Sequence, residues 1–278
     1  MSDLTSNPSN FGESFNAEDR RTLTEPQTDW RVWQDGAVAT QFVKERRSAI
    51  LGGATQLEVM LELLPPRPPN LAPTWMLDLG CGDGVLLETI LRHWTGANGV
   101  ALDGSPTMLE LALERLSIFH PAAVSFVSED ISLPEWRKAL PVSQFDAIVS
   151  GFCIHHLEDE RKKALYAEIY ELLAPGGVFV NIEHVASATP HGEELFSRAY
   201  VRNIVRRKIE RGEEGIFEDE LTHFVNRLDA SANRLTSVET QLQWLSTLGY
   251  TDVDCYWKHY ELAVFAGYKK TKDLLFTD

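Results

Sequence analysis

The sequence predicts an α/β protein in which a doubly wound parallel sheet is covered by helices on both faces. Short apolar segments alternate with amphipathic ones from Trp75 onward, which is typical of repeated strand–helix units. Three glycines at every second position, Gly80, Gly82 and Gly84, follow the first apolar segment and indicate a turn into a helix. A Pro-Gly-Gly turn that begins at Pro175 precedes another apolar run. The fold class therefore follows from the spacing of apolar segments and turns.

The expected strands and helices alternate along the chain. We expect strands at 75–79, 98–102, 123–127, 145–150 and 177–183, and helices at 84–94, 106–118, 134–140 and 159–173. Right-handed crossovers between parallel strands place such helices on both faces of a sheet. Ligands of these sheets bind outside the carboxyl ends of the strands. The informative residues are therefore those that follow each strand.

Charge limits the kinds of partner. The 278 residues include 41 acidic and 26 basic ones, which gives a formal net charge of −15. An acidic surface repels phosphate backbones, and this argues against nucleic acid as a partner. The arginine-rich run at 202–211 lies among glutamates, as expected of a solvated helix face. No apolar run approaches the ~18 residues of a membrane span, so we expect no membrane contact.

The cysteines indicate a reducing compartment. Cys81, Cys153 and Cys255 are odd in number and widely spaced, and they form neither a CxxC motif nor a disulfide framework. The polar start of the sequence lacks the pattern of a secretory signal. We therefore expect a cytoplasmic protein.

The loop at 78–84 is the most informative motif. Its glycines let a ligand approach the backbone closely. A dinucleotide fingerprint is excluded because Val85 occupies the place of its third glycine, and a P-loop is excluded because the loop has no lysine. The segment Asp78-Leu79-Gly80-Cys81-Gly82-Asp83-Gly84 resembles motif I of the class I S-adenosylmethionine (SAM) methyltransferases.

Acidic residues follow the second and third expected strands. Asp103 stands nineteen residues beyond Gly84, where a carboxylate can accept both hydroxyls of a ribose. The alternative is a helix N-cap region, for which Ser105 already suffices. Asp130 could accept an adenine amino group while the Ile131 N–H faces the ring, or it could be a solvated loop acid.

Four blocks in order extend the resemblance. Residues 76–84, 100–103, 129–131 and 145–157, with the Leu-x-Pro-Gly-Gly turn, resemble motifs I to V of class I SAM-dependent methyltransferases. The resemblance covers roughly residues 70–185. It implies a Rossmann-like seven-stranded sheet whose last strand is antiparallel, with SAM as the cofactor. The C-terminal segments at 241–268 are similar to small-molecule methyltransferases and to carboxy-SAM synthases.

The resemblance implies a set of cofactor-binding residues at the ends of the strands. Met108 could pack on the adenine or in the core, and the small Ser150 and Gly151 leave room for the methionine part of the ligand. The full set is Asp78, Gly80, Cys81, Gly82, Asp103, Gly104, Met108, Asp130, Ile131, Ser150 and Gly151.

The expected domain organisation has five parts. A mobile arm at 1–28 precedes a helical cap at 29–70, and the SAM-binding core spans 71–185. A helical lid insert at 186–236 lies between the fifth and sixth strands, and 237–278 completes the core sheet. We expect the cap and the insert to close over the carboxyl edge of the sheet.

Histidines near that edge are candidate bases. Methyl transfer from a sulfonium needs alignment and exclusion of water, and a base helps when the nucleophile is a hydroxyl or an amine. We select His155, His156 and His184, with Glu183 and His191 as further candidates. Either member of the His155-His156 pair could instead pack structurally. No metal is expected, since these residues lack a His-Glu-x-x-His spacing.

Three functions are compatible with the sequence. SAM-dependent methyl transfer to a small-molecule acceptor is favoured. A carboxy-SAM synthase, or a binder of that cofactor, would need an arginine for the extra carboxylate, and Arg227 is the candidate. A non-catalytic partner protein with the same fold is the third, and the intact glycines and Asp103 argue against it. The acceptor, the methylated atom and the oligomeric state, including a homodimer, stay open.

Overall fold

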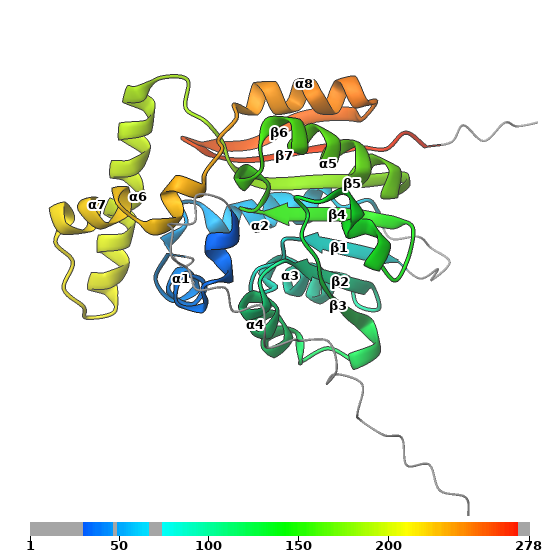
Figure 1. Ribbon diagram of the computed structural model, residues 1–278, viewed down its shortest axis with the longest axis horizontal. Coiled ribbons are helices and arrows are strands. Elements are labelled where there is room, and N and C mark those ends of the chain that lie inside the picture. Colours follow the sequence, from blue (N-terminus) through cyan, green and yellow to red (C-terminus); the bar gives the residue numbers. More distant parts are fainter. Residues whose placement is uncertain (1–29, 47–48, 67–73, 272–278) are drawn as a thin grey trace, which may run out of the picture.

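A seven-stranded sheet forms the centre of the computed structural model (Figure 1). The strands lie in the order β3-β2-β1-β4-β5-β7-β6. β1 to β5 are parallel, and β7 is antiparallel to both β5 and β6. The expected seven-stranded sheet with an antiparallel last strand is therefore confirmed. The strands are β1 (Trp75–Leu79), β2 (Asn98–Asp103), β3 (Val124–Ser128), β4 (Phe145–Gly151), β5 (Leu173–His184), β6 (Thr251–His259) and β7 (Leu262–Tyr268).

The structure describes residues 30–46, 49–66 and 74–271. The arm expected at 1–28 lies outside these ranges, and so do most of the linker before β1 and residues 272–278. No helix within the described ranges combines the length and the apolar character that crossing a bilayer requires.

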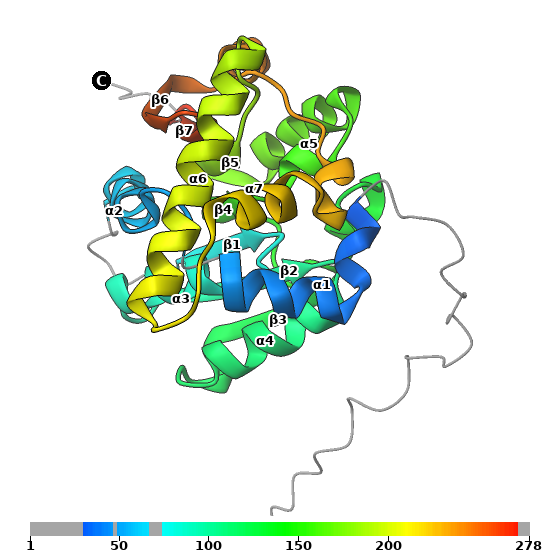
Figure 2. The ribbon, with the colours of Figure 1, turned by 90° about the vertical axis from the view of Figure 1, so that its left-hand side faces the viewer.

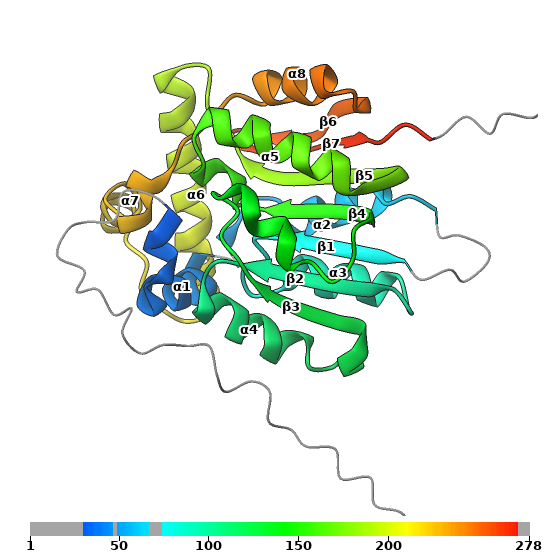
Figure 3. The same ribbon diagram turned by 45° about the vertical axis from the view of Figure 1, so that its right-hand side comes forward.

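Two helical layers cover the sheet (Figure 3). Alternate residues of a strand point to opposite faces, and β1 shows this, because Met76 packs in one layer and Leu77 and Leu79 in the other. All three side chains are fully buried. The first layer contains α2 (Gly53–Leu63), α3 (Val85–His93) and α4 (Pro106–Leu116); the second contains α5 (Asp159–Leu172), α8 (Val238–Leu248) and the 3₁₀ helix η6 (Pro134–Ala139).

Local polar residues and glycines set the ends of the core helices. Ser105 caps α4 by accepting a hydrogen bond from the Met108 amide, and Pro106 is the first helical residue. Ser237 caps α8 in the same way, and Gly249 ends it in the left-handed region with φ of 96°. These helix boundaries can therefore be predicted from the capping residues in the sequence.

Two segments outside the core lie over the carboxyl ends of the strands (Figure 2). They touch each other, because Ala232 packs with Val32 and Val38. The N-terminal segment comprises η2 (Trp30–Gln34), α1 (Gly36–Gln41) and the π-helical η3 (Phe42–Arg46). The insert between β5 and α8 comprises α6 (Pro190–Glu210), α7 (Phe217–Val225) and η8 (Leu228–Ala232). The short 3₁₀ helices η5 (Pro121–Ala123) and η7 (Ile154–His156) lie within the core.

The expected helical cap divides into two differently placed parts. Residues 30–46 lie over the strand ends, whereas α2 packs on the sheet face beside α3 through Met60 and Leu63. Gly52 stands at the division with φ of 68°, and an added Cβ would lie 2.5 Å from the Trp257 ring. Only glycine fits both requirements.

The other boundary differences are small. β5 begins at Leu173 rather than at 177, because the Pro-Gly-Gly turn is absorbed as an irregularity in its pairing with β4. The helix expected at 134–140 is the 3₁₀ helix η6. Neither difference moves the strand ends that face the site.

Candidate active site

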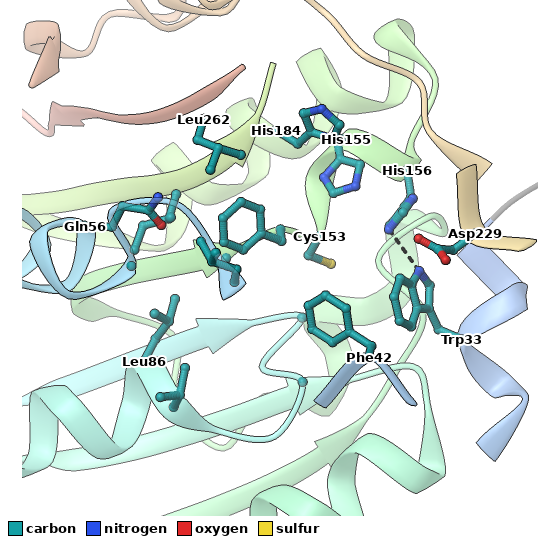
Figure 4. Close-up of a pocket in the computed structure, with 18 of the residues that line it drawn as sticks. Trp33, Phe42, Gln56, Leu86, Cys153, His155, His156, His184, Asp229 and Leu262 are labelled. Carbon is teal, nitrogen blue, oxygen red and sulfur yellow. Dashed lines mark hydrogen bonds between the residues drawn. The ribbon is translucent and has the colours of Figure 1, made fainter. Parts of the chain in front are cut away.

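A cavity of about 650 Å³ opens at the carboxyl ends of the strands, at the point where the strand order reverses between β1 and β4. We call the side formed by the loops after β1, β2 and β3 the loop end. We call the side formed by α6, α7 and η8 the insert end. The N-terminal segment and the start of α2 complete the wall. Figure 4 shows Phe42, Cys153 and His155 turned toward one space.

The glycine loop and Asp103 are held together at the loop end. Gly82 donates its amide hydrogen to Asp103 Oδ2 at 2.8 Å, and the Ser105 amide donates to Asp103 Oδ1 at 2.8 Å. Gly80 has φ of 68°, and an added Cβ would lie 2.0 Å from Cys153 Sγ. The carboxylate thus faces the turn and lines the cavity. Burial raises the pKa of Asp103 to about 6, although the backbone hydrogen bonds oppose this.

An ion-pair cluster holds the glycine loop from behind. Arg115 on α4 pairs with Asp83 Oδ2 at 2.6 Å and with Glu88 Oε2 at 2.8 Å. The same guanidinium donates to the Asp83 carbonyl at 2.8 Å. These charge-assisted hydrogen bonds fix the loop relative to α3 and α4.

Most of the expected cofactor-binding residues line one cavity. The exception is Ser150, which is fully buried and donates its hydroxyl to the Leu79 carbonyl at 2.8 Å, so it links β4 to β1 instead of reaching the ligand space. Asp78 also has a structural bond, since its Oδ2 accepts from the Leu87 amide at 3.1 Å. The expected residues that do line the cavity are Asp78, Gly80, Cys81, Gly82, Asp103, Gly104, Met108, Asp130, Ile131 and Gly151.

His155 has the geometry of a base held by a carboxylate. Its Nδ1 lies 2.6 Å from Glu183 Oε1, and its backbone amide donates to Glu183 Oε2 at 3.0 Å. Among the described residues, none bonds to its Nε2, and the ring lines the cavity. Burial, followed by the nearby His184, lowers the pKa of His155 well below its usual value, and burial raises that of Glu183 to about 7.

His156 is engaged at both ring nitrogens. Trp33 Nε1 donates to His156 Nε2 at 2.9 Å, and His156 Nδ1 lies 3.2 Å from the Ala232 carbonyl (Figure 4). With Nε2 accepting, the proton resides on Nδ1, which donates to that carbonyl. The imidazole therefore joins the N-terminal segment to the insert and has no lone pair for a substrate proton. Of the two adjacent histidines, only His155 keeps a base-like arrangement.

His184 forms a second histidine–glutamate pair. Its Nε2 lies 2.8 Å from Glu261 Oε2, and its ring centroid is 5.6 Å from that of His155. His184 lines the cavity, whereas Glu261 is 2% exposed and lies behind it. His191 is different, because its side chain is 75% exposed on α6 and lies outside the cavity lining. The structure therefore gathers His155 and His184 and leaves His191 at the surface.

Most of the insert end was not predicted from the sequence. Residues of α6, α7 and η8 line this part of the cavity, and Trp33 and Phe42 of the N-terminal segment face them. The sequence showed the helical character of the insert, the arginine-rich run at 202–211 and Arg227, but not that Arg206, Arg207 and Arg227 line one cavity. Glu261 carried one usable signal, since an acidic residue directly precedes the apolar run of β7. The insert-end residues include Phe196, Tyr200, Asn203, Arg206, Arg207, Phe224, Arg227 and Asp229.

Over residues 30–46, 49–66 and 74–271, no three or more histidine, cysteine, aspartate or glutamate side chains converge in a way that could hold a metal ion. The histidines at the cavity instead bond to glutamates, a carbonyl and an indole.

Comparison with known proteins identifies the central part of the chain. Residues 76–177 match the family model described as "Methyltransferase domain". We refer to these matched residues as the methyltransferase domain. The matched residues begin in β1 and end in β5, so they include the glycine loop, Asp103 and both histidines of η7. The resemblance to class I SAM-dependent methyltransferases is therefore confirmed for this methyltransferase domain.

Two curated relatives match parts of the chain. The malonyl-[acyl-carrier protein] O-methyltransferase of Paenibacillus sp. (strain JDR-2) is 30% identical over 105 residues, which is 38% of this chain and 37% of that protein. The carboxy-S-adenosyl-L-methionine synthase of Citrobacter koseri is 29% identical over 175 residues, or 61% of this chain and 66% of that protein. The chain thus spans about a third to two thirds of the length of these relatives.

A solved structure agrees on the fold. The CurJ carbon methyltransferase superposes with a TM-score of 0.58 at 16% sequence identity, covering 86% of this chain and 59% of that one. At this identity the likeness establishes the architecture alone. It extends beyond the methyltransferase domain to most of the chain.

Proposed function

We propose that this chain is a SAM-dependent methyltransferase whose acceptor is a small molecule with a proton-bearing nucleophile. One observation carries the proposal: the cavity holds the glycine loop and Asp103 at one side and the His155–Glu183 pair beside them. The methyltransferase family match and the O-methyltransferase relative support it.

The loop end fits the adenosyl part of SAM. Asp103 presents its carboxylate beside the Gly82 amide, where ribose hydroxyls can donate to it. Asp130 and Ile131 line the neighbouring part of the cavity, as adenine recognition requires. The close approach of Cys153 to Gly80 leaves no room for a side chain in the turn. A cavity of about 650 Å³ is within the ~300–1,000 Å³ usual for ligand sites.

His155 is the proposed general base. Bound SAM supplies a methyl group on a positively charged sulfur that is already activated for displacement. The acceptor's proton passes to His155 Nε2, while Glu183 keeps the tautomer with hydrogen on Nδ1 and stabilises the imidazolium. The lowered pKa of His155 keeps the imidazole neutral at pH 7, so its Nε2 has a lone pair for the acceptor's proton. His184, held by Glu261, is a second candidate for contact with the acceptor.

The insert and the N-terminal segment are proposed to act as a lid. They meet over the cavity through Ala232 and through the Trp33–His156 hydrogen bond. Water that entered the cavity would compete with the acceptor and weaken the electrostatic interactions there. A lid that excludes water therefore serves alignment and displacement together.

The two alternatives are not favoured. The family match and the first of the two relatives are methyltransferases, and this argues against a carboxy-SAM synthase. A non-catalytic partner protein would have no use for a geometry in which a carboxylate meets the glycine loop and a histidine–glutamate pair lies at the same cavity. A cytoplasmic location and a homodimer remain parts of the proposal, the first resting on three widely spaced cysteines.

Isothermal titration of the full chain with SAM and with S-adenosylhomocysteine tests the cofactor assignment. We expect both to bind, and absence of binding would overturn the proposal. Transfer is then tested by incubating the chain with SAM that carries a deuterated methyl group and a metabolite extract. Mass spectrometry should detect a metabolite that gains the labelled methyl, and His155→Gln should suppress that product. Carboxy-SAM carried through purification would instead support the synthase alternative.

A further inference from the structure

The insert end of the cavity contains a cluster of arginines in a protein with a net charge of −15. Arg206 and Arg207 come from the end of α6, and Arg227 directly precedes η8. Within the described residues, Arg206 and Arg207 share one carboxylate, that of Glu210, at 3.8 and 3.1 Å. One carboxylate cannot neutralise two guanidinium groups, so this pair keeps a positive charge.

Arg206 and Arg227 are held in place by neighbouring groups. Arg206 donates to Asn203 Oδ1, and Asn203 Nδ2 donates to the Ala49 carbonyl at 2.7 Å. Arg227 donates to the Phe224 carbonyl and lies 4.2 Å above the Phe224 ring. A guanidinium fixed in this way is prepared for a planar anion, since little conformational freedom remains to be lost on binding.

The three arginine side chains differ in how far they are exposed to solvent. The Arg227 side chain is 18% exposed, that of Arg207 45% and that of Arg206 64%. Arg227 pairs with Asp229 Oδ2 at 3.3 Å and is thus partly compensated. The deepest arginine therefore reaches the interior, and the other two lie toward the mouth with most of the positive charge.

An aromatic wall connects the arginines to the proposed base. The His184 ring lies 5.6 Å from His155 and 5.2 Å from Phe196. Phe196 lies 6.5 Å from Phe224, the ring beneath Arg227. Tyr200 stacks on Phe224 at 5.0 Å and fills the space beside this path. An apolar acceptor body that lies along the wall would place one end at His155 and the other at Arg227, in the cavity that Arg206 and Arg207 also line.

We infer that the acceptor is an amphiphilic anion: an apolar body with the methylated group at one end and a carboxylate or phosphate group at the other, bound by Arg206, Arg207 and Arg227. This inference rests on the proposed function for the placement of the methylated group. The arginine site itself depends only on the cavity. Charge-assisted and bidentate hydrogen bonds from arginine are the interactions that suit such an anion.

The test compares two dyes of similar aromatic body on the full chain saturated with S-adenosylhomocysteine. 8-Anilinonaphthalene-1-sulfonate carries one anionic group, and N-phenyl-1-naphthylamine lacks it. We expect the anionic dye to bind about tenfold or more tightly than the neutral one in fluorescence titrations, since each charge-assisted hydrogen bond accounts for about that factor. Equal affinity for the two dyes would overturn the inference.

Variants locate the preference. We expect about tenfold weaker binding of the anionic dye in two variants, the double variant Arg206→Gln/Arg207→Gln and the single variant Arg227→Gln. The affinity for the neutral dye should stay unchanged in both. Arg227→Lys should retain part of the affinity. Arg202→Gln is the matched control, because Arg202 is exposed on the same helix and lies outside the cavity lining. A preference that survives in the arginine variants contradicts the inference.

Two further experiments show which anionic group the site prefers and whether the site exists independently of the proposed methyltransferase function. Phenylacetate and phenyl phosphate compete with the bound dye, and the stronger competitor identifies the preferred group; displacement by neither overturns the inference. Calorimetry with S-adenosylhomocysteine on each variant shows that the chain is folded. If the parent chain fails to bind the cofactor while the dye preference persists without it, the proposed function fails and the anion site stands.

Discussion

The loop end and the insert end of the cavity differ in charge and in origin. Acidic residues, Asp103 and Asp130 among them, line the loop end, and they lie at or just beyond the ends of consecutive strands of the methyltransferase domain. Arginines and aromatic rings line the insert end, and they come from helices outside the family match. This contrast suggests that one end serves a cofactor shared by the family and the other an acceptor particular to this chain.

The sharpest difference between neighbours is that between His155 and His156. His155→Gln should lower kcat by about 10²–10⁴-fold, the usual contribution of a general base, and leave the affinity for SAM unchanged. His156→Gln should lower stability more than it lowers the rate of methyl transfer, because His156 is buried and bonded at both nitrogens. Single-turnover assays and thermal unfolding of both variants measure this. Equal rate losses in the two would show that His155 has no separate chemical role.

The loop end is tested by removing its carboxylate. Asp103→Ala should weaken SAM binding by about 1.5–3 kcal/mol for each charge-assisted hydrogen bond lost, which is roughly tenfold or more in Kd. Calorimetry measures the change. Arg227→Gln is a useful comparison, since it alters the insert end and should leave SAM affinity close to that of the parent. An unchanged Kd in Asp103→Ala would contradict the ribose assignment.

The same carboxylate predicts a pH dependence. Asp103 in the free folded protein has a pKa raised to about 6, and ribose hydroxyls that donate to it favour the ionised form. SAM affinity should therefore fall about tenfold between pH 7 and pH 5. The stability of the free protein should change in the opposite direction with pH. The stabilisation that protonated Asp103 contributes to the folded state is fully present below the pKa of the unfolded chain and is lost as the pH rises through about 6. Titrations at several pH values should show the trend, and Asp103→Asn should remove it.

The smallest expected effect concerns the junction between the two segments over the cavity. Trp33→Phe removes the donor to His156 Nε2 and leaves a buried nitrogen without its bond, which should reduce stability by about 1–3 kcal/mol. Chemical denaturation measures this directly. If the two segments act as a lid, methyl transfer should also slow in this variant while Asp103-dependent SAM binding persists. A rate equal to the parent's would indicate that the junction serves folding alone.

Much of the loop end was predictable from sequence because its determinants are local. A short strand–turn–helix segment is enough to specify the turn that contains Gly80 and Gly82. Asp103 ends the neighbouring strand, nineteen residues beyond Gly84. Parallel strands with right-handed crossovers then bring these strand ends together without further information. Ser150 shows the limit, since it lies near the carboxyl end of β4 as expected, but its hydroxyl turns toward Leu79.

Sequence alone determined the sheet, the glycine loop and the carboxylate beside it, because periodicity and turn residues act over short stretches of chain. Only the tertiary structure decided which histidine is free to act as a base, since the partners of His155 and His156 lie 28 and 123 residues away. The same holds for Arg206, Arg207 and Arg227. Only the packing of α6 and of the segment before η8 places these side chains in the lining of one cavity. Contacts between distant segments depend on packing of the whole chain, and no local pattern records them.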